Sequence, residues 1–213
     1  MKNLRIGKKL LLTFMLIILL FCGTVFLAIT GLNRNSEKYS EFYNVGYQVT
    51  NKVMNMRRGL QIIVKDLAFI TIEEDESKRQ TYQEDIDKEL DLLQENGQWL
   101  FENFDGDASL LEAFSANITE AVTLQKEVIE ISHTDMEAAR VILLEEYQGL
   151  VQEAVNNLIN ISDVVAQNAE NDYNETVSMQ EILIIAQLGM AGVALIITLF
   201  LSTYLTRSIT RPL

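Results

Sequence analysis

Two long runs of apolar residues lie near the ends of the chain, and neither contains a charged residue. They extend from Leu10 to Thr30 and from Ile182 to Thr206. A helix needs about 20 apolar residues to cross the hydrocarbon core of a bilayer, so both runs predict membrane-spanning helices. A cleaved signal peptide is the alternative for the first run, but the apolar core of such a peptide is usually only about 7–15 residues long.

Between the runs, apolar residues recur at spacings of three and four, a pattern typical of helices that pack side by side. The first stripe comprises Tyr39, Phe42, Gly46, Val49, Val53, Met56, Leu60, Ile63, Leu67 and Ile70. Two later stripes comprise Leu111, Phe114, Ile118, Ala121 and Val128, and then Met136, Leu143, Tyr147, Leu150, Ala154, Leu158, Ile161 and Val165. The only proline is Pro212, so long uninterrupted helices are permitted between the runs.

Three helix starts are predicted by capping boxes, in which a hydroxyl and an amide or carboxylate satisfy free backbone N–H groups. The boxes are Ser77–Gln80, Ser109–Glu112 and Thr134–Glu137. The first follows the acidic break Glu73–Glu76, and the second follows the turn Asp105–Asp107. These starts divide the segment between the runs into four helices.

The lengths of these helices predict the fold. The outer two have about 42 and 47 residues, hence roughly 60–70 Å, and the middle two have about 25 residues, hence roughly 40 Å. We therefore expect an all-α protein, an antiparallel up-down-up-down four-helix bundle whose first and last helices continue into the two spans. No linker separates the fourth helix from the second span, whereas a bend is expected at Gly31 or Asn33.

The charges predict the orientation in the membrane. Four basic residues precede the first run, Arg207 and Arg211 follow the second, and no acidic residue lies in either flank. The remaining 11 basic and all 30 acidic residues lie between the runs, a net charge of −19. Basic flanks stay in the cytoplasm. This predicts a cytoplasmic N-terminus (1–9), spans at 10–30 and 182–206, an extracytoplasmic sensor domain (31–181) and a cytoplasmic end (207–213) in the cell membrane.

Charge also predicts how two copies would pair. Residues 31–72 carry six basic and three acidic residues, whereas residues 135–181 carry ten acidic residues and only Arg140. The first and fourth helices should therefore attract each other, and two fourth helices should repel. We predict a homodimer whose seam is formed chiefly by the first helices.

The chain resembles the sensory region of methyl-accepting chemotaxis proteins that have a four-helix-bundle ligand-binding domain. The segments that carry the resemblance are Met54–Leu60 in the first helix and Thr134–Leu158 in the fourth. The end Arg207–Leu213 is similar to the start of a HAMP signal-converting module, which implies signal-transmitting roles for Arg207, Arg211 and Pro212. The resemblance implies a chemoreceptor that detects a small molecule or a ligand-loaded binding protein and acts on a downstream HAMP and kinase-control module.

Two alternatives to this function remain. The same kind of sensor precedes histidine kinases and nucleotide cyclases, which would change the output. A membrane-anchored structural coiled coil that binds no signal is the alternative from another class. No Walker loop, dinucleotide-binding glycine motif or His/Cys cluster occurs. We therefore expect no enzymatic activity, no cofactor, no metal site and no nucleic-acid partner.

The candidate ligand-binding residues are Arg57, Arg58, Trp99 and Tyr147. Receptors of the resembled family hold a ligand carboxylate with first-helix arginines, and the planar guanidinium suits that anion because it donates two parallel hydrogen bonds. The alternative for the arginines is an ion pair with acids of a neighbouring helix. The alternative for the two aromatic residues is a place in the core or at its rim. His133, the only histidine, is expected to be a solvated turn residue.

Overall fold

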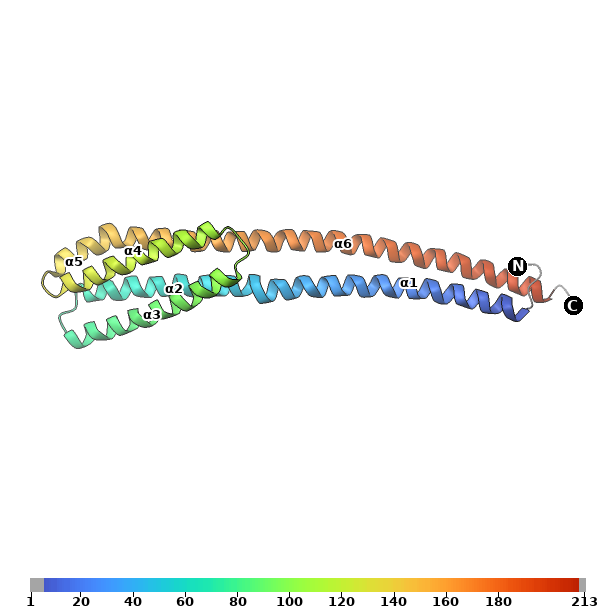
Figure 1. Cartoon of the computed structure of the whole chain (residues 1–213), viewed down its shortest axis with the longest axis horizontal. Helices are drawn as coiled ribbons and strands as arrows, with labels where there is room; N and C mark the ends of the chain where they lie inside the picture. Colours follow the sequence, from blue (N-terminus) through green and yellow to red (C-terminus); the bar gives the residue numbers. More distant parts are fainter. Residues whose placement is uncertain (1–5, 211–213) are drawn as a thin grey trace. The chain divides into compact units, whose positions relative to one another are not determined.

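The computed structural model describes residues 6–210, and this part of the chain is helical except at three short connections, 71–75, 104–107 and 133–135 (Figure 1). The helices are α1 (Ile6–Glu41), η1 (Phe42–Gly46), α2 (Tyr47–Ile70), α3 (Glu76–Asn103), α4 (Ala108–Ser132), α5 (Met136–Ile142), η2 (Leu143–Tyr147) and α6 (Gln148–Thr210). No strand occurs within residues 6–210. The prediction of an all-α four-helix bundle is confirmed.

The chain divides into two compact units. One contains the two end segments, up to Ser40 and from Asn171 onward, and the other contains Glu41–Glu170. We call the first the paired-helix unit and the second the bundle unit. We call the end of the bundle unit where α2 leads into α3 and α4 leads into α5 its tip.

The core of the bundle unit contains the stripes that the sequence predicts. From α2 it includes Val49, Val53, Met56, Leu60, Ile63, Leu67 and Ile70, all at most 2% exposed. The first two members of the predicted stripe, Tyr39 and Phe42, are instead 69% and 50% exposed. Each fully buried side chain of this size contributes about 1.5–3 kcal/mol to folding, so the stripe from Val49 onward is a main source of stability.

Two glycines lie where α2 and α3 pack. A Cβ atom added at Gly97 of α3 would lie 3.9 Å from Met56 Cε, and one added at Gly59 of α2 would lie 2.9 Å from Glu89 Oε2. Both glycines are buried. A Cβ at Gly97 would make ordinary van der Waals contact, whereas one at Gly59 would require the Glu89 carboxylate to move.

Three aspartates are the N-caps of α3, α4 and α5. Asp75, Asp107 and Asp135 have extended backbones, and each carboxylate accepts a hydrogen bond from the first turn of its helix. The donors are the backbone N–H groups of Ser77, Ser109 and Ala138, at 3.0, 2.9 and 3.0 Å. The bond from Ser109 holds the pKa of Asp107 below its usual value of 3.8.

The predicted capping boxes are therefore wrong in detail. Each helix begins within two residues of its predicted start, but Ser77, Ser109 and Thr134 are not the capping residues. A carboxylate is favoured over a hydroxyl at these places because it is a stronger acceptor and because the positive end of the helix dipole attracts negative charge.

Two π-helical turns interrupt the α-helices. In η2 the Gln148 N–H donates to the Leu143 carbonyl oxygen, and in η1 the Tyr47 N–H donates to the Phe42 carbonyl oxygen. The buried residues Ala139, Leu143, Tyr147 and Val151 are four residues apart. An α-helix has 3.6 residues per turn, so such a stripe would turn away from the core, and a wider π-turn keeps it aligned.

The predicted bend at Gly31 or Asn33 is wrong. Residues 6–41 form one regular α-helix, and the irregular turn occurs at η1 instead. At the other end, α6 is a single helix from Gln148 to Thr210, which confirms that no linker precedes the second apolar run.

The paired-helix unit holds both apolar runs. The two helices that contain them are long and apolar enough to cross a membrane, and most large apolar side chains of the runs are exposed, such as Phe26 and Phe200. Two glycines of α1 lie against side chains of α6: a Cβ at Gly31 would lie 2.7 Å from Leu183 Cδ1, and one at Gly23 would lie 3.4 Å from Met190 Sδ. Exposed apolar helices with satisfied backbones fit a two-pass membrane protein.

Candidate functional site

The two candidate arginines lie on α2 between buried residues. Arg57 is half-buried, and its Nε atom is buried without a hydrogen-bond partner. Arg58 is exposed. Within residues 6–210, neither guanidinium lies in an ion pair, so their predicted alternative role as ion-pair partners is not realised inside one chain. Arg57 Nε is closed off from solvent, whereas the exposed Arg58 guanidinium keeps donors for a group from outside.

An exposed strip runs along the same helix. The Tyr43 and Tyr47 rings stack with centroids 5.6 Å apart, and Met54 is 60% exposed. Spacings of seven and four place Tyr47, Met54 and Arg58 on one face. We call Tyr47, Met54 and Arg58 the outer face of α2, and Tyr43 of η1 adjoins it.

Only part of the first-helix stripe is free to form the predicted dimer seam. Tyr39 and Phe42 are exposed, and a seam formed chiefly by the first helices stays a prediction. The stripe from Val49 to Ile70 is buried inside its own chain, so it cannot contact a second copy. The reason is that a four-helix bundle consumes the main apolar face of each helix. A second copy would have to contact another face, and the outer face of α2 is an exposed apolar surface on the same helix.

The two aromatic candidates have different surroundings. Trp99 is half-buried on α3, and the Lys52 ammonium lies 5.0 Å from its ring centroid while donating to Asn96 Oδ1 at 3.0 Å. This is a cation–π contact between α2 and α3. Tyr147 lies in η2 with only 2% of its surface exposed, and burial raises the pKa of its hydroxyl well above the usual value. Tyr147 is thus a core residue.

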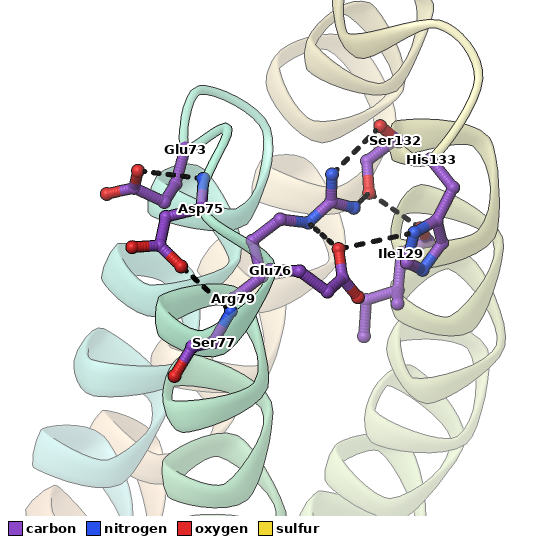
Figure 2. A network of polar contacts seen from close by, with 8 residues as sticks. All are labelled: Glu73, Asp75, Glu76, Ser77, Arg79, Ile129, Ser132 and His133. Atoms are coloured by element: carbon purple, nitrogen blue, oxygen red, sulfur yellow. Dashed lines mark hydrogen bonds and ion pairs between the residues drawn. The ribbon is translucent and has the colours of Figure 1, made fainter.

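A polar network at the tip was not predicted from the sequence (Figure 2). Arg79 is 6% exposed and donates from Nη2 to Ser132 Oγ at 2.6 Å and from Nη1 to the Ser132 carbonyl oxygen at 3.3 Å. Its Nε lies 3.8 Å from Glu76 Oε2, which lies 4.0 Å from His133 Nδ1. The network joins the first turn of α3 to the last turn of α4. His133 is about half exposed, as expected of a turn residue.

A sequence signal for Arg79 was nevertheless available. The buried residues Arg79, Ile86, Leu93 and Leu100 of α3 follow one another at intervals of seven. A charged residue at a heptad core position is expected to be buried with a partner. The spacing therefore indicated burial, but not that the partner would be Ser132.

The buried polar residues of the bundle unit gather toward its tip. They are Asp66, Thr71, Arg79, Gln125 and Ser132. The Asp66 carboxylate lies 3.0 Å from Lys65 Nζ, whereas Gln125 Oε1 has no hydrogen-bond partner. The rest of the core is apolar.

The residues expected to transmit the signal are only partly described. Arg207 is exposed near the end of α6, whereas Arg211 and Pro212 lie outside the described residues. In the paired-helix unit, Lys38 Nζ of α1 lies 2.6 Å from Asp172 Oδ1 and 4.0 Å from Glu175 Oε2 of α6. These contacts tie the first and last helices together.

Comparison with known proteins adds one finding. A family model described as a four helix bundle sensory module for signal transduction matches residues 3–179. Neither the curated proteins nor the solved structures gave a match to the chain. The matched range includes the first apolar run and nearly all of the segment between the runs.

Proposed function

Because the chain belongs to the family of four-helix-bundle sensory modules of methyl-accepting chemotaxis proteins, we propose that it is the sensing and transmitting part of a transmembrane chemoreceptor. The bundle unit lies outside the cytoplasm, both ends of the chain lie inside, and residues 207–213 begin a HAMP module. The signal is a small molecule or a ligand-loaded binding protein. A downstream kinase-control module receives it.

The continuity of α6 is the observation that carries this proposal. The chain passes from the core residue Tyr147 directly into one helix that reaches Thr210. Packed helices slide by an ångström or two between discrete states. A signal that changes the packing of the bundle core would therefore displace α6 along its axis, and the displacement would reach the inner side of the membrane without passing through a flexible joint.

Ligand capture is proposed for Arg57 and Arg58. Support comes from the absence of ion pairs at either guanidinium within residues 6–210 and from the exposure of Arg58. A carboxylate matches these donors, although the negative charge of the segment slows the approach of anions. A homodimer that contacts through the outer face of α2 would bring two copies of Arg58 toward the same interface.

The proposal is tested with a chimera in which residues 1–213 precede the cytoplasmic module of an established chemoreceptor. The chimera is expressed in a bacterium that lacks its own receptors, and kinase output is measured against a panel of small carboxylates, amines and sugars. We expect at least one compound to change the output. Because a structural coiled coil would not respond, a chimera that is folded in the membrane and silent to every compound and to culture supernatant contradicts the proposal.

The rigidity of α6 is tested by replacing Thr176, Val177 and Ser178, which keeps the length of the helix and the register of Asp172 and Glu175. Three alanines at these positions keep the helix. Three glycines make the same segment flexible, because glycine costs about 1 kcal/mol per residue in a helix. The alanine variant should respond and the glycine variant should not. Equal responses would reject transmission through a rigid helix.

The arginine site is tested with Arg57→Ala and Arg58→Ala in the same chimera. Each should raise the half-maximal concentration of an active carboxylate at least tenfold, because each removes charge-assisted hydrogen bonds. Lys126→Ala, which removes an exposed cation of α4 that lies in no ion pair within residues 6–210, is the control and should leave the response unchanged. An unchanged response in both arginine variants would move the site elsewhere.

A further inference from the structure

The contact between Lys38 and two carboxylates of α6 has the features of a latch with two positions. We propose that the Lys38 ammonium pairs with Asp172 in one register of α1 and α6 and with Glu175 in the other, and that this exchange of partners makes the displacement of α6 a switch between two states. This inference rests on the proposed function. In it, Lys38 is a positioning residue for signal transmission.

The three residues are placed for such an exchange. Lys38 lies near the end of α1, and Asp172 and Glu175 lie on α6 in the same paired-helix unit. Residues three apart lie on the same face of a helix, about 4.5 Å apart along its axis. Both carboxylates therefore face α1 near Lys38, in successive turns of α6.

The two distances from the Lys38 ammonium show that it pairs closely with Asp172 and only weakly with Glu175. Lys38 Nζ lies 2.6 Å from Asp172 Oδ1, a direct charge-assisted hydrogen bond, and 4.0 Å from Glu175 Oε2, the outer limit of an ion pair. The difference is of the same size as the ångström or two by which packed helices slide in signalling transitions. A slide of α6 of about that length would complete the second bond while breaking the first.

The strength of the contact suits a reversible switch. The side chains of Lys38, Asp172 and Glu175 are 37%, 39% and 62% exposed. Exposed ion pairs shift equilibria by up to about fivefold, so neither position traps the helix. A second contact between α1 and α6 lies nearby. Arg34 Nη1 donates to Met179 Sδ at 3.3 Å, and this contact involves no carboxylate.

The direction of the movement follows from the chain direction. Residue numbers of α6 increase toward its apolar run, so Glu175 lies nearer the second predicted span than Asp172. To bring Glu175 to the ammonium, α6 must move away from the membrane relative to α1. Asp172→Asn should therefore favour the outward register, and Glu175→Gln should favour the register of the structure.

The register can be measured by disulfide cross-linking in membranes, independently of any output. In the Cys22→Ser background, Gly31→Cys is combined either with Met179→Cys or with Gln187→Cys. Leu183 lies opposite Gly31, and these two positions lie one turn to either side of it on α6. Outward movement raises the rate of the 31–187 link relative to the 31–179 link. We expect this ratio to increase about two- to fivefold in Asp172→Asn, and to stay equal or fall in Glu175→Gln.

The controls separate a latch from a simple tie between helices. Glu181→Gln removes an exposed carboxylate of α6 away from Lys38 and should leave the ratio unchanged. Lys38→Arg keeps the cation and should behave as the wild type. Lys38→Glu combined with Asp172→Lys reverses the charges of the first ion pair, so only the register in which residues 38 and 172 pair should be restored. If the ion pair only holds the two helices together, Asp172→Asn and Lys38→Met should both weaken their association. Neither variant should then raise the rate of one cross-link relative to the other.

The chimera then tests the consequence for signalling. Asp172→Asn should shift the unstimulated output, and Glu175→Gln should leave it unchanged or shift it in the opposite direction. If the cross-linking ratio changes as expected while no compound alters the output, the latch stands and the chemoreceptor proposal fails. If the two variants change the ratio in the same direction, or leave it as it is in the wild type, the latch is rejected whatever the output does.

Discussion

Arg79 and Gln125 are both buried toward the tip of the bundle unit, but they differ in their hydrogen-bond partners. Arg79 makes two hydrogen bonds to Ser132, and its Nε atom, which has no hydrogen-bond partner, lies 3.8 Å from Glu76 Oε2. Gln125 is 3% exposed and its Oε1 atom has no partner. An unsatisfied buried carbonyl costs about 1–3 kcal/mol. The buried amide of Gln125 therefore lowers the stability of the core.

Replacing that amide should stabilise the protein. Gln125→Met keeps the length of the side chain and removes the unsatisfied oxygen, so we expect the free energy of unfolding to rise by about 1–2 kcal/mol. The measurement is thermal or urea unfolding of the full chain in nanodiscs. Gln94→Met, at an exposed position of α3, should change stability by less than about 0.5 kcal/mol. A loss of stability in Gln125→Met would mean that the amide has a partner outside the chain.

At the scale of the element, the aspartate caps set where three helices begin. The sequence places a hydroxyl residue and an aspartate within two positions of each other at every start. Both types cap helices, and pattern alone did not decide between them. The choice depends on which residue has the extended backbone that aims its side chain at the first turn, as Asp135 does.

The cap of α5 gives a direct test of that choice. Asp135→Ala removes the acceptor for the Ala138 N–H and should destabilise the protein by about 0.5–2 kcal/mol. Thr134→Ala removes only a hydroxyl that donates to the Ile131 carbonyl oxygen, and should cost less than about 0.5 kcal/mol. The two midpoints of thermal unfolding are compared in one buffer. The reverse order would restore Thr134 as the cap.

The π-turn η2 is an element that one deletion should remove. Removing Glu145 brings Tyr147 to three residues after Leu143, and spacings of four and three fit an ordinary α-helix. We expect the core and stability to be retained. Removing Glu153 from α6 instead rotates every later residue by about 100° and should lower the unfolding midpoint strongly. Circular dichroism during heating measures both variants, and equal losses would show that η2 is not a one-residue insertion.

At the scale of the whole molecule, the two units are suited to different surroundings. The bundle unit buries its stripes within the chain, whereas the paired-helix unit leaves its apolar side chains exposed. In water such a surface would drive association, and in a bilayer it is the surface that contacts lipid. The change of environment expected at the ends of the apolar runs, Thr30 and Ile182, therefore lies inside the paired-helix unit and not at its division from the bundle unit.

The predicted topology can be checked by cysteine labelling of spheroplasts. In the Cys22→Ser background, Ser115→Cys places a thiol on the exposed surface of α4, and Lys8→Cys places one before the first apolar run. A membrane-impermeant maleimide should label residue 115 in intact spheroplasts and residue 8 only after permeabilisation, because basic flanks remain inside. Labelling of residue 8 in intact spheroplasts would contradict the orientation.

The sequence by itself determined the helices, their approximate ends, the two apolar runs and the residues of the main core stripe. These features are local, because periodicity, charge and the absence of proline act within a few turns. It did not determine which partner a stripe contacts. The stripe from Val49 to Ile70 could have faced its own chain or a second copy, and only the packing of the bundle decided this.

The contacts of the candidate sites were also decided by the tertiary structure. Arg79 and Ser132 are 53 residues apart in sequence, and Lys38 and Asp172 are 134 apart. No local rule selects one carboxylate or hydroxyl among so many when the helices that carry them are far apart in the chain. Such pairs depend on the axial alignment of helices, which the packing of all their side chains sets together.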